Sequence, residues 1–136
     1  IQDPGNLGTI LRTADALEVP VVLLDGCADA YNPKTVRATM GAVFRTQPVR
    51  MTRAEAVQSC RAAGIPLLAT AMSADAVDLR KKNLSVCAVV IGSEGRGVSA
   101  ELFAAADGKI IIPMNPRCES LNAAAAATIV LWQMKC

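Results

Sequence analysis

The sequence predicts an α/β domain built on a mainly parallel sheet with helices packed against it. Short apolar segments recur along the 136 residues, helical segments lie between them, and hydrophobic residues make up 52% of the chain. Strands that are apolar along their whole length are typical of parallel sheets buried on both faces. A chain of this length is sufficient for one compact domain and too short for two ordinary ones.

Five segments are predicted to be strands because each is short, apolar and largely β-branched. They cover residues 19–24, 48–51, 66–70, 85–91 and 109–112. No internal repeat or low-complexity linker interrupts them, so we expect residues 1–136 to form one domain. In open sheets of this class, ligands bind outside the carboxyl ends of the strands, which draws attention to the loops that follow residues 91 and 112.

The first helix is predicted over residues 6–17, where apolar side chains recur at helical spacing on one face. These side chains are Leu7, Ile10, Leu11, Ala14 and Leu17. A second helix is expected after Asn32, a favoured N-cap residue, because Pro33 suits the first helical position. Thr52 and Glu55 have the spacing of a capping box, which predicts the start of a third.

The remaining helix signals lie toward the C-terminus. Gly64 is a typical helix stop, and Ser99 is suited to cap a helix over residues 100–106. The last helix is predicted over residues 121–135, with Ser120 as its natural cap. It carries five consecutive alanines, so we expect it to pack closely against a neighbouring element.

The chain contains no histidine. This excludes the Ser-His-Asp triad, the Cys-His dyad, the H-E-x-x-H zinc helix and an imidazole proton shuttle. The five cysteines form no C-x-x-C pair, so we expect no metal site and reduced thiols. Their pattern is typical of a cytoplasmic protein or of one from an organelle matrix. The longest apolar run, residues 123–132, is about half of the ~20 residues that a membrane helix needs.

Charge is distributed unevenly although the net charge is only +2. Residues 1–30 hold one base against five acids, whereas residues 34–61 hold six bases against one acid. The basic segment is either an ordinary solvated surface or a patch that follows phosphates. Arginine predominates in it, and a planar guanidinium suits phosphate.

Gly92-Ser93-Glu94-Gly95-Arg96-Gly97 follows a predicted strand directly. Three glycines in six positions permit close approach of a ligand to the backbone, although a tight surface turn is the alternative interpretation. The order G-x-x-G-x-G differs from the dinucleotide-binding G-x-G-x-x-G, and no Gly-Lys-Ser/Thr follows. Glu94 would repel a phosphate and suits a cationic ligand or a ribose hydroxyl.

A stiff loop with two prolines runs from the last strand into the last helix over residues 112–122. Ser120 and Asn122 at its end either cap the helix or serve a site. On the first helix, Arg12 falls opposite the apolar face, so the core does not need it. It is either a solvated arginine or a functional one.

Three motifs in this order closely resemble the SpoU/TrmH branch of the SPOUT methyltransferases. They are N-x-G-x-x-x-R at 6–12, G-S-E-G-x-G at 92–97 and I-P-M-x(5)-S-L-N at 112–122. Residues 31–34 and 37–42 match the family's second helix, so the resemblance covers essentially the whole chain. It implies a C-terminal deep trefoil knot, a rare exception to the rule against knots, and transfer of a methyl group from S-adenosylmethionine to a ribose 2′-hydroxyl of RNA.

The resemblance also implies site residues. The catalytic positions of the family fall on Asn6, Arg12, Glu94, Ser120 and Asn122. The methyl-donor pocket of the family falls on Thr70, Gly92, Ile112, Met114 and Leu121. Arg12 is the family's proposed base, but a guanidinium stays protonated at neutral pH, so the alternative is that it binds a phosphate and stabilises developing negative charge.

RNA is the expected partner, with ribosomal RNA favoured over transfer RNA. Arg12, Lys34, Arg37 and Arg45 are the residues that we expect to contact it. With only four large aromatics, base stacking is not expected to dominate. The resemblance implies a homodimer through the knot region, with each active site built from both subunits. Residues 1–136 would then be the catalytic domain of a longer chain with an N-terminal RNA-binding region. The rival interpretation is a non-catalytic nucleotide- or RNA-binding α/β module.

Overall fold

A computed structural model describes all residues from Ile1 to Cys136. The helices are α1 (Pro4–Ala16), α2 (Pro33–Thr39), α3 (Ala42–Arg45), α4 (Arg53–Ala63), the 3₁₀ helix η1 (Leu79–Lys81), α5 (Ala100–Ala105) and α6 (Ala123–Met134). The strands are β1 (Val22–Leu24), β2 (Val49–Met51), β3 (Leu67–Thr70), β4 (Val77–Asp78), β5 (Ala88–Val90) and β6 (Gly108–Ile111). All five predicted strands are present: the first four are shorter than predicted, and the fifth has the predicted length but begins one residue earlier.

Every strand pairing is parallel, which confirms the predicted fold class. The strands form two sheets instead of one: β1 pairs with β2, and the other four have the order β4-β6-β3-β5. An apolar cavity of about 500 Å³, lined by both β1 and β5, lies where the sheets face each other. Leu24 of β1 and Val90 of β5 pack against the same hydrophobic cluster, so side-chain contacts connect the two sheets although no backbone ladder joins them.

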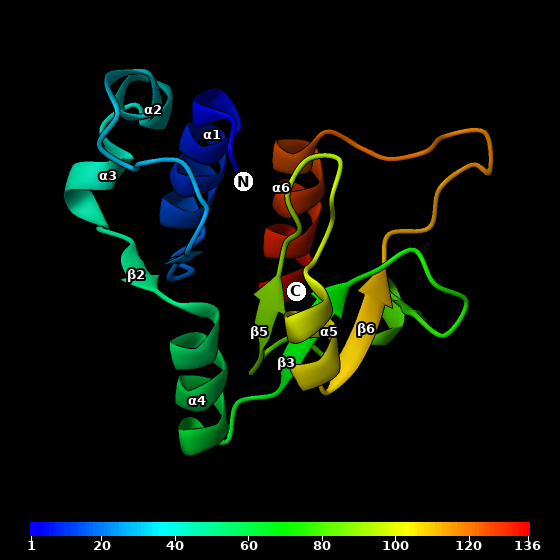
Figure 1. The fold of residues 1–136 in the computed structure, drawn as a ribbon. Helices are drawn as coiled ribbons and strands as arrows, with labels where there is room; N and C mark the ends of the chain where they lie inside the picture. The colour runs from blue at the N-terminus through cyan, green and yellow to red at the C-terminus, as the bar shows by residue number, and fades with distance from the viewer.

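Helices cover both faces of the four-stranded sheet. Adjacent residues of β3 point to opposite sides of the sheet and so pack against different helices. Leu68 packs with Val130 of α6 in one buried cluster. Its neighbour Ala69 packs with Leu102 of α5 in another. Figure 1 shows α6 between this sheet and α1, so the last helix joins the two parts of the molecule.

The alanine run of α6 provides that contact. Ala124 and Ala127 are buried with Ile10 of α1 in one cluster, as the small side chains predicted. The start of α6 differs from the prediction, however. The helix begins at Ala123, and Asn122 is its N-cap instead of Ser120, because the Asn122 side chain accepts hydrogen bonds from the backbone of Ala124 and Ala125.

The other capping signals are confirmed. Thr52 and Glu55 form a complete capping box at α4, and Gly64 ends that helix in the left-handed conformation. Asn32 caps α2 and Ser99 caps α5. The short elements α3, β4 and η1 were not predicted, since pieces of two to four residues are too short for periodicity to reveal. No helix is both long and apolar enough to cross a membrane.

α1 and α2 approach each other closely at Gly8. A Cβ atom built at Gly8 would lie 2.7 Å from the backbone oxygen of Thr35 and would also collide with the side chain of Ala38. Thr35 is fully buried at this contact. The contact therefore requires the absence of a side chain at position 8.

We predict that Gly8→Ala destabilises the protein by about 1 to 3 kcal/mol, because the new methyl group forces α1 and α2 apart. Urea unfolding measures this difference. Gly5→Ala in the same helix is the control, since its Cβ would meet only the Asp3 side chain, at 3.1 Å. Equal stability of the two variants would contradict the proposed contact.

Candidate functional site

The carboxyl ends of β3, β5 and β6 lie at one edge of the parallel sheet, and a cavity of about 710 Å³ opens there. Three loops line most of it: residues 70–72, the glycine loop 92–97 and the long loop from Ile112 to Asn122. Asn6 from the start of α1 also lines the cavity. This is the edge at which the fold class predicts a ligand.

The glycine loop is a tight, backbone-defined structure. Ser93 and Gly97 exchange two backbone hydrogen bonds of 3.2 and 3.0 Å, and Gly95 and Gly97 have φ angles of 79° and 68°. A Cβ atom at Gly92 would lie 2.6 Å from both Gly97 Cα and Val98 N. Only glycine therefore fits at position 92, and the backbone itself forms this wall of the cavity.

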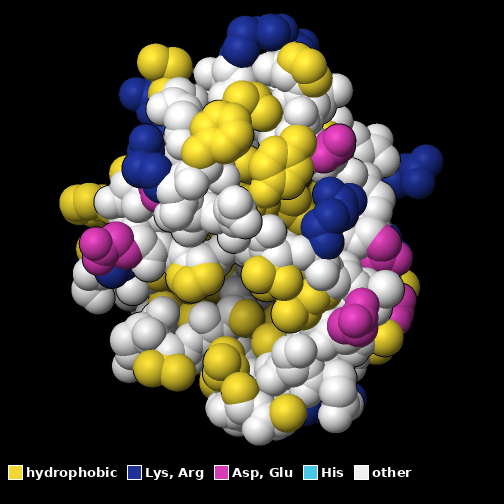
Figure 2. All heavy atoms as spheres, turned by 90° about the vertical axis from the view of Figure 1, so that its left-hand side faces the viewer, with side chains coloured by type: hydrophobic (Ala, Val, Ile, Leu, Met, Phe, Trp, Pro, Cys, Tyr) yellow, Lys and Arg dark blue, Asp and Glu magenta, His cyan; other side chains and the backbone are white.

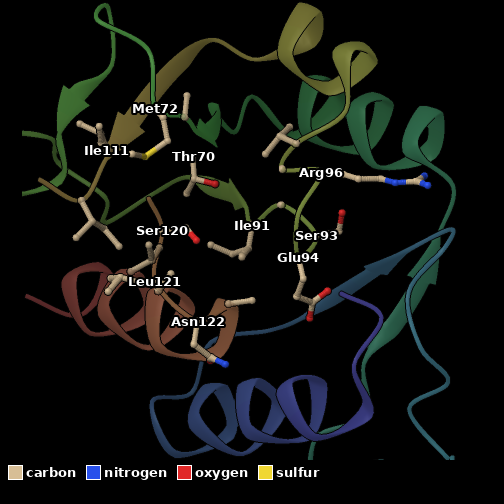
Figure 3. A pocket seen from close by; sticks show the side chains of 18 of the residues that line it. Thr70, Met72, Ile91, Ser93, Glu94, Arg96, Ile111, Ser120, Leu121 and Asn122 are labelled. Atoms are coloured by element: carbon tan, nitrogen blue, oxygen red, sulfur yellow. The ribbon is translucent and has the colours of Figure 1, made fainter. Parts of the chain in front are cut away.

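A chain of hydrogen bonds connects the three sequence motifs. Asn6 Nδ2 donates to Glu94 Oε1 at 3.1 Å, and Asn122 Nδ2 donates to Asn6 Oδ1 at 3.2 Å. The backbone N–H of Gln2 donates to Glu94 Oε2 at 3.1 Å. Figure 3 shows Glu94 and Asn122 both pointing toward α1. Glu94 lies 88 positions after Asn6 in the sequence, and Asn122 lies 116 positions after it. The fold thus brings these three distant residues together as one polar wall of the cavity.

The hydrogen bonds to Glu94 keep its carboxylate ionised. Partial burial by itself would raise the pKa of this carboxyl group, but the bonds from its own backbone, from Gln2 N and from Asn6 outweigh that effect. The pKa of Glu94 is therefore lower than its ordinary value. At neutral pH the cavity carries a fixed negative charge beside two amide side chains.

The five residues that the resemblance assigns to the methyl-donor pocket all line this cavity. Thr70 closes the end of β3, where its hydroxyl donates to Val90 O at 3.1 Å. Ser120 lines the same cavity and has no cap to form, because Asn122 occupies that role. The roles of these residues stay predictions.

Arg12 does not line this cavity. It lies four residues after Gly8, which contacts α2, and three before Asp15, which bonds to Arg45 of α3. Arg12 therefore shares the face of α1 that is turned to α2 and α3, about 120° around the helix from Asn6. Within one chain, the structure separates Arg12 from Asn6, Glu94, Ser120 and Asn122.

The basic residues differ in their surroundings. Lys34 and Arg37 are exposed on α2 without an ion pair, as is Arg12 on α1. Arg45 is instead held by Asp15, with 2.9 Å between Nη2 and Oδ2. The acidic segment thus neutralises part of the basic one, and Arg45 is less available to a phosphate than we expected.

Sequence reasoning missed several cavity residues. Met72, Ile91 and Ile111 sit at or just beyond the carboxyl ends of their strands, so the strand-end rule alone would have included them. Phe103 and Val130 reach the cavity from helices and left no signal in the sequence.

The cysteines lie outside this site. Burial raises the pKa of the Cys60 and Cys87 thiols, and no cysteine lines the cavity. No cluster of three metal-ligating side chains is present.

Comparison with known proteins agrees with the geometry. A sequence model of the SpoU rRNA Methylase family matches residues 1–132. The 23S rRNA (guanosine(2553)-2′-O)-methyltransferase RlmP of Bacillus subtilis is 38% identical over 136 residues, which cover 99% of this chain and 55% of that protein.

Two solved structures are similar as well. The AdoMet-bound rRNA methyltransferase from Sinorhizobium meliloti superposes with a TM-score of 0.91 at 39% identity, over 98% of this chain and 52% of that one. The SpoU methyltransferase AviRb from Streptomyces viridochromogenes, in complex with AdoMet, gives 0.89 at 34% identity, over 98% and 56%. This chain thus spans about half the length of the relatives that it matches.

The lowered pKa of Glu94 predicts a pH-dependent contribution to stability. A carboxyl group with a folded-state pKa below its unfolded-state value of about 4.5 stabilises the fold at neutral pH, and this contribution is lost as the pH falls below that value. Between about pH 5 and pH 3, the free energy of unfolding should fall more steeply for the wild type than for Glu94→Gln. Urea unfolding across this range measures it, with Glu101→Gln as the exposed control. Parallel profiles for the wild type and Glu94→Gln would contradict the assignment.

Proposed function

This chain belongs to the SpoU rRNA methylase family, and from that premise we propose that it transfers a methyl group from S-adenosylmethionine to a ribose 2′-hydroxyl of RNA. The observation that carries the proposal is the hydrogen-bonded chain Glu94–Asn6–Asn122 on the wall of a cavity lined by the glycine loop. It joins all three motifs on which the resemblance to the family rests.

The cavity fits a donor of this kind. Its volume of about 710 Å³ is in the range of small-molecule and cofactor sites. The bare backbone at Gly92 allows close contact with a flat ring system, and the side chains of Ile112 and Leu121 supply apolar surface for its faces. The ionised Glu94 suits a donor that carries positive charge on sulfur. We assign Thr70, Gly92, Ile112, Met114 and Leu121 to this pocket.

When bound, S-adenosylmethionine supplies a methyl group that its positively charged sulfur already activates. The residues of the chain then have to align the acceptor and manage its proton. Ser120 and Asn122 lie at the cavity end of the long loop, where they can orient the ribose hydroxyl. Asn6 fixes the position of the Glu94 carboxylate and of the Asn122 amide. Arg12 binds the adjacent phosphate and stabilises developing negative charge on the hydroxyl oxygen.

Arg12 requires a second copy of the chain to perform this role, because it faces away from the cavity of its own chain. We therefore propose a homodimer in which the partner subunit's Arg12 completes each site. α6 offers an apolar strip for the interface: Ala125, Ile129 and Trp132 follow one another at helical spacing, and Ile129 and Trp132 are 40% and 62% exposed. Leu121 continues this strip to the rim of the cavity.

Ribosomal RNA is the substrate that we favour over transfer RNA. RlmP of Bacillus subtilis and the Sinorhizobium meliloti enzyme both act on rRNA by name. Of the four residues that we expect to contact RNA, Lys34, Arg37 and Arg12 form no ion pair and are free to meet its phosphates. We propose a cytoplasmic location for the same reason, since the substrate is found there.

Residues 1–136 make up the catalytic domain in this proposal, and a separate RNA-binding region accounts for the additional length of the relatives. The proposal includes the C-terminal trefoil knot of the family. The sheet order supports it: β6 lies between β3 and β4, so the last loop leaves from inside the sheet before α6 returns beside α1. Figure 1 shows this loop swinging far out from the sheet before it reaches α6.

Labelled methyl transfer to total RNA, followed by mapping of the alkali-resistant linkage, tests the proposal. We expect the label on a ribose 2′-oxygen of ribosomal RNA. Binding of S-adenosylmethionine without transfer to any RNA would favour the non-catalytic module. A thermal shift without stabilisation at saturating S-adenosylmethionine would contradict the donor site.

Arg12→Ala should abolish methyl transfer and leave the affinity for S-adenosylmethionine unchanged, because Arg12 does not line the donor cavity. Calorimetry with S-adenosylmethionine and a transfer assay measure the two quantities. Arg61→Ala on α4 is the matched control, since Arg61 is also exposed and without an ion pair. Loss of donor binding in Arg12→Ala would contradict the separation of the two roles.

Mixing two inactive variants tests the shared site. A heterodimer of Arg12→Ala and Glu94→Gln subunits contains one site with both residues intact if Arg12 acts across the interface. About half of randomly assembled dimers are mixed, and each mixed dimer has one intact site out of two. Activity should therefore return to about a quarter of the wild-type value. If the mixture stays inactive, Arg12 acts within its own subunit.

A further inference from the structure

Large apolar side chains are exposed on the side of the molecule formed by α2 and α3. Tyr31, just before α2, is 52% exposed, and Phe44 on α3 is 67% exposed. Met40, between the two helices, is exposed as well. Figure 2 looks onto this side, and its upper half shows hydrophobic side chains with several lysine and arginine side chains and an acidic one around them. Two of the four aromatic residues of the chain thus lie on an open basic surface.

The backbone beneath these two rings is anchored in the core. Ala30 and Val43, the neighbours of Tyr31 and Phe44 in the sequence, are almost fully buried in the same hydrophobic cluster. Met40 and Gly41 both have left-handed backbones, with φ of 53° and 90°, and they set the turn from α2 into α3. The core therefore fixes the backbone from which both rings project into solvent.

The charges around the rings favour an anionic ligand. Lys34 and Arg37 on α2 are exposed and form no ion pair, and Arg12 lies on the face of α1 that is turned to α2. Of the acids nearby, Asp15 is neutralised by Arg45. Asp29 is exposed, and its carboxylate accepts the backbone N–H of Tyr31. Around Tyr31, the basic side chains that form no ion pair, Lys34, Arg37 and Arg12, therefore outnumber the unpaired carboxylate of Asp29.

We propose that this surface binds a single-stranded RNA segment next to the target nucleotide, with unpaired bases stacked on Tyr31 and Phe44 and phosphates bound by Lys34 and Arg37. The inference rests on the proposed function. Every base offers a flat face to an aromatic ring, whereas a duplex hides those faces, so exposed rings discriminate in favour of unpaired RNA. Arg12 on the same side of the molecule would connect this segment to the reacting ribose.

A second copy of the chain is a poorer occupant of this surface. In a twofold-symmetric interface the same patch faces itself, so Lys34 and Arg37 would approach and repel their own equivalents. The apolar strip on α6 carries no such charge. The two exposed apolar surfaces thus suit different partners.

The test compares Tyr31→Leu and Phe44→Leu with Tyr31→Phe and Phe44→Tyr. Leucine keeps an apolar side chain but removes the ring, and the second pair keeps the ring. Affinities are measured for a fluorescent oligouridylate and for an RNA duplex of the same length. We expect each leucine variant to bind the oligouridylate roughly tenfold more weakly, the aromatic variants to match the wild type, and duplex binding to change little.

Three results would overturn the inference: leucine variants that bind the oligouridylate as tightly as the wild type, equal weakening in leucine and aromatic variants, or equal loss of single-stranded and duplex binding. A change of sedimentation coefficient in Phe44→Leu would also overturn it, in favour of a protein partner. S-adenosylmethionine affinity of the wild type is measured in parallel. If it is absent, the proposed function fails, whereas intact donor binding with no aromatic effect refutes this inference alone.

Discussion

The hydrogen bonds of Asn6 with Glu94 and Asn122 are the interaction on which the arrangement of this protein depends. Asn6 belongs to the N-terminal part, Glu94 to the glycine loop, and Asn122 to the loop that ends at α6. Asn122 also caps α6, the helix that packs against both α1 and the four-stranded sheet. One small polar network therefore couples the position of the last helix to the shape of the cavity. A change in any of its three members affects both.

Close backbone approach is the second constraint. Gly8 brings α1 against α2, and Gly92 brings the glycine loop against itself. Alanines perform the same task between α1 and α6. These contacts leave no space for larger side chains, so the helices and loops that surround the cavity have little freedom to move apart. A cavity with a rigid backbone wall suits a reaction that requires accurate alignment of two substrates.

The absence of histidine is compatible with the polar groups that line the cavity. A carboxylate kept ionised by amide and backbone donors, with a hydroxyl and two amides near it, provides orientation and charge without a group that changes protonation near neutral pH. The arginine that the family resemblance adds to this set, Arg12, lies on the face of α1 that is turned to α2 and α3 and does not line the cavity. In the function that we propose, its position links the chemistry of the site to the assembly of two chains.

The sequence by itself determined the fold class, the five main strands, most helix caps and the identity of the motifs, because apolar periodicity and capping act over a few neighbouring residues. Tertiary structure decided what those local signals do not contain. It made Asn122 the cap of α6 and left Ser120 to the cavity, since Asn122 also bonds to Asn6, far away in the sequence. It placed Arg45 against Asp15 and exposed Tyr31 and Phe44 on one side of the molecule. Each of these depends on how distant segments pack against one another, and no local pattern of residues records such contacts.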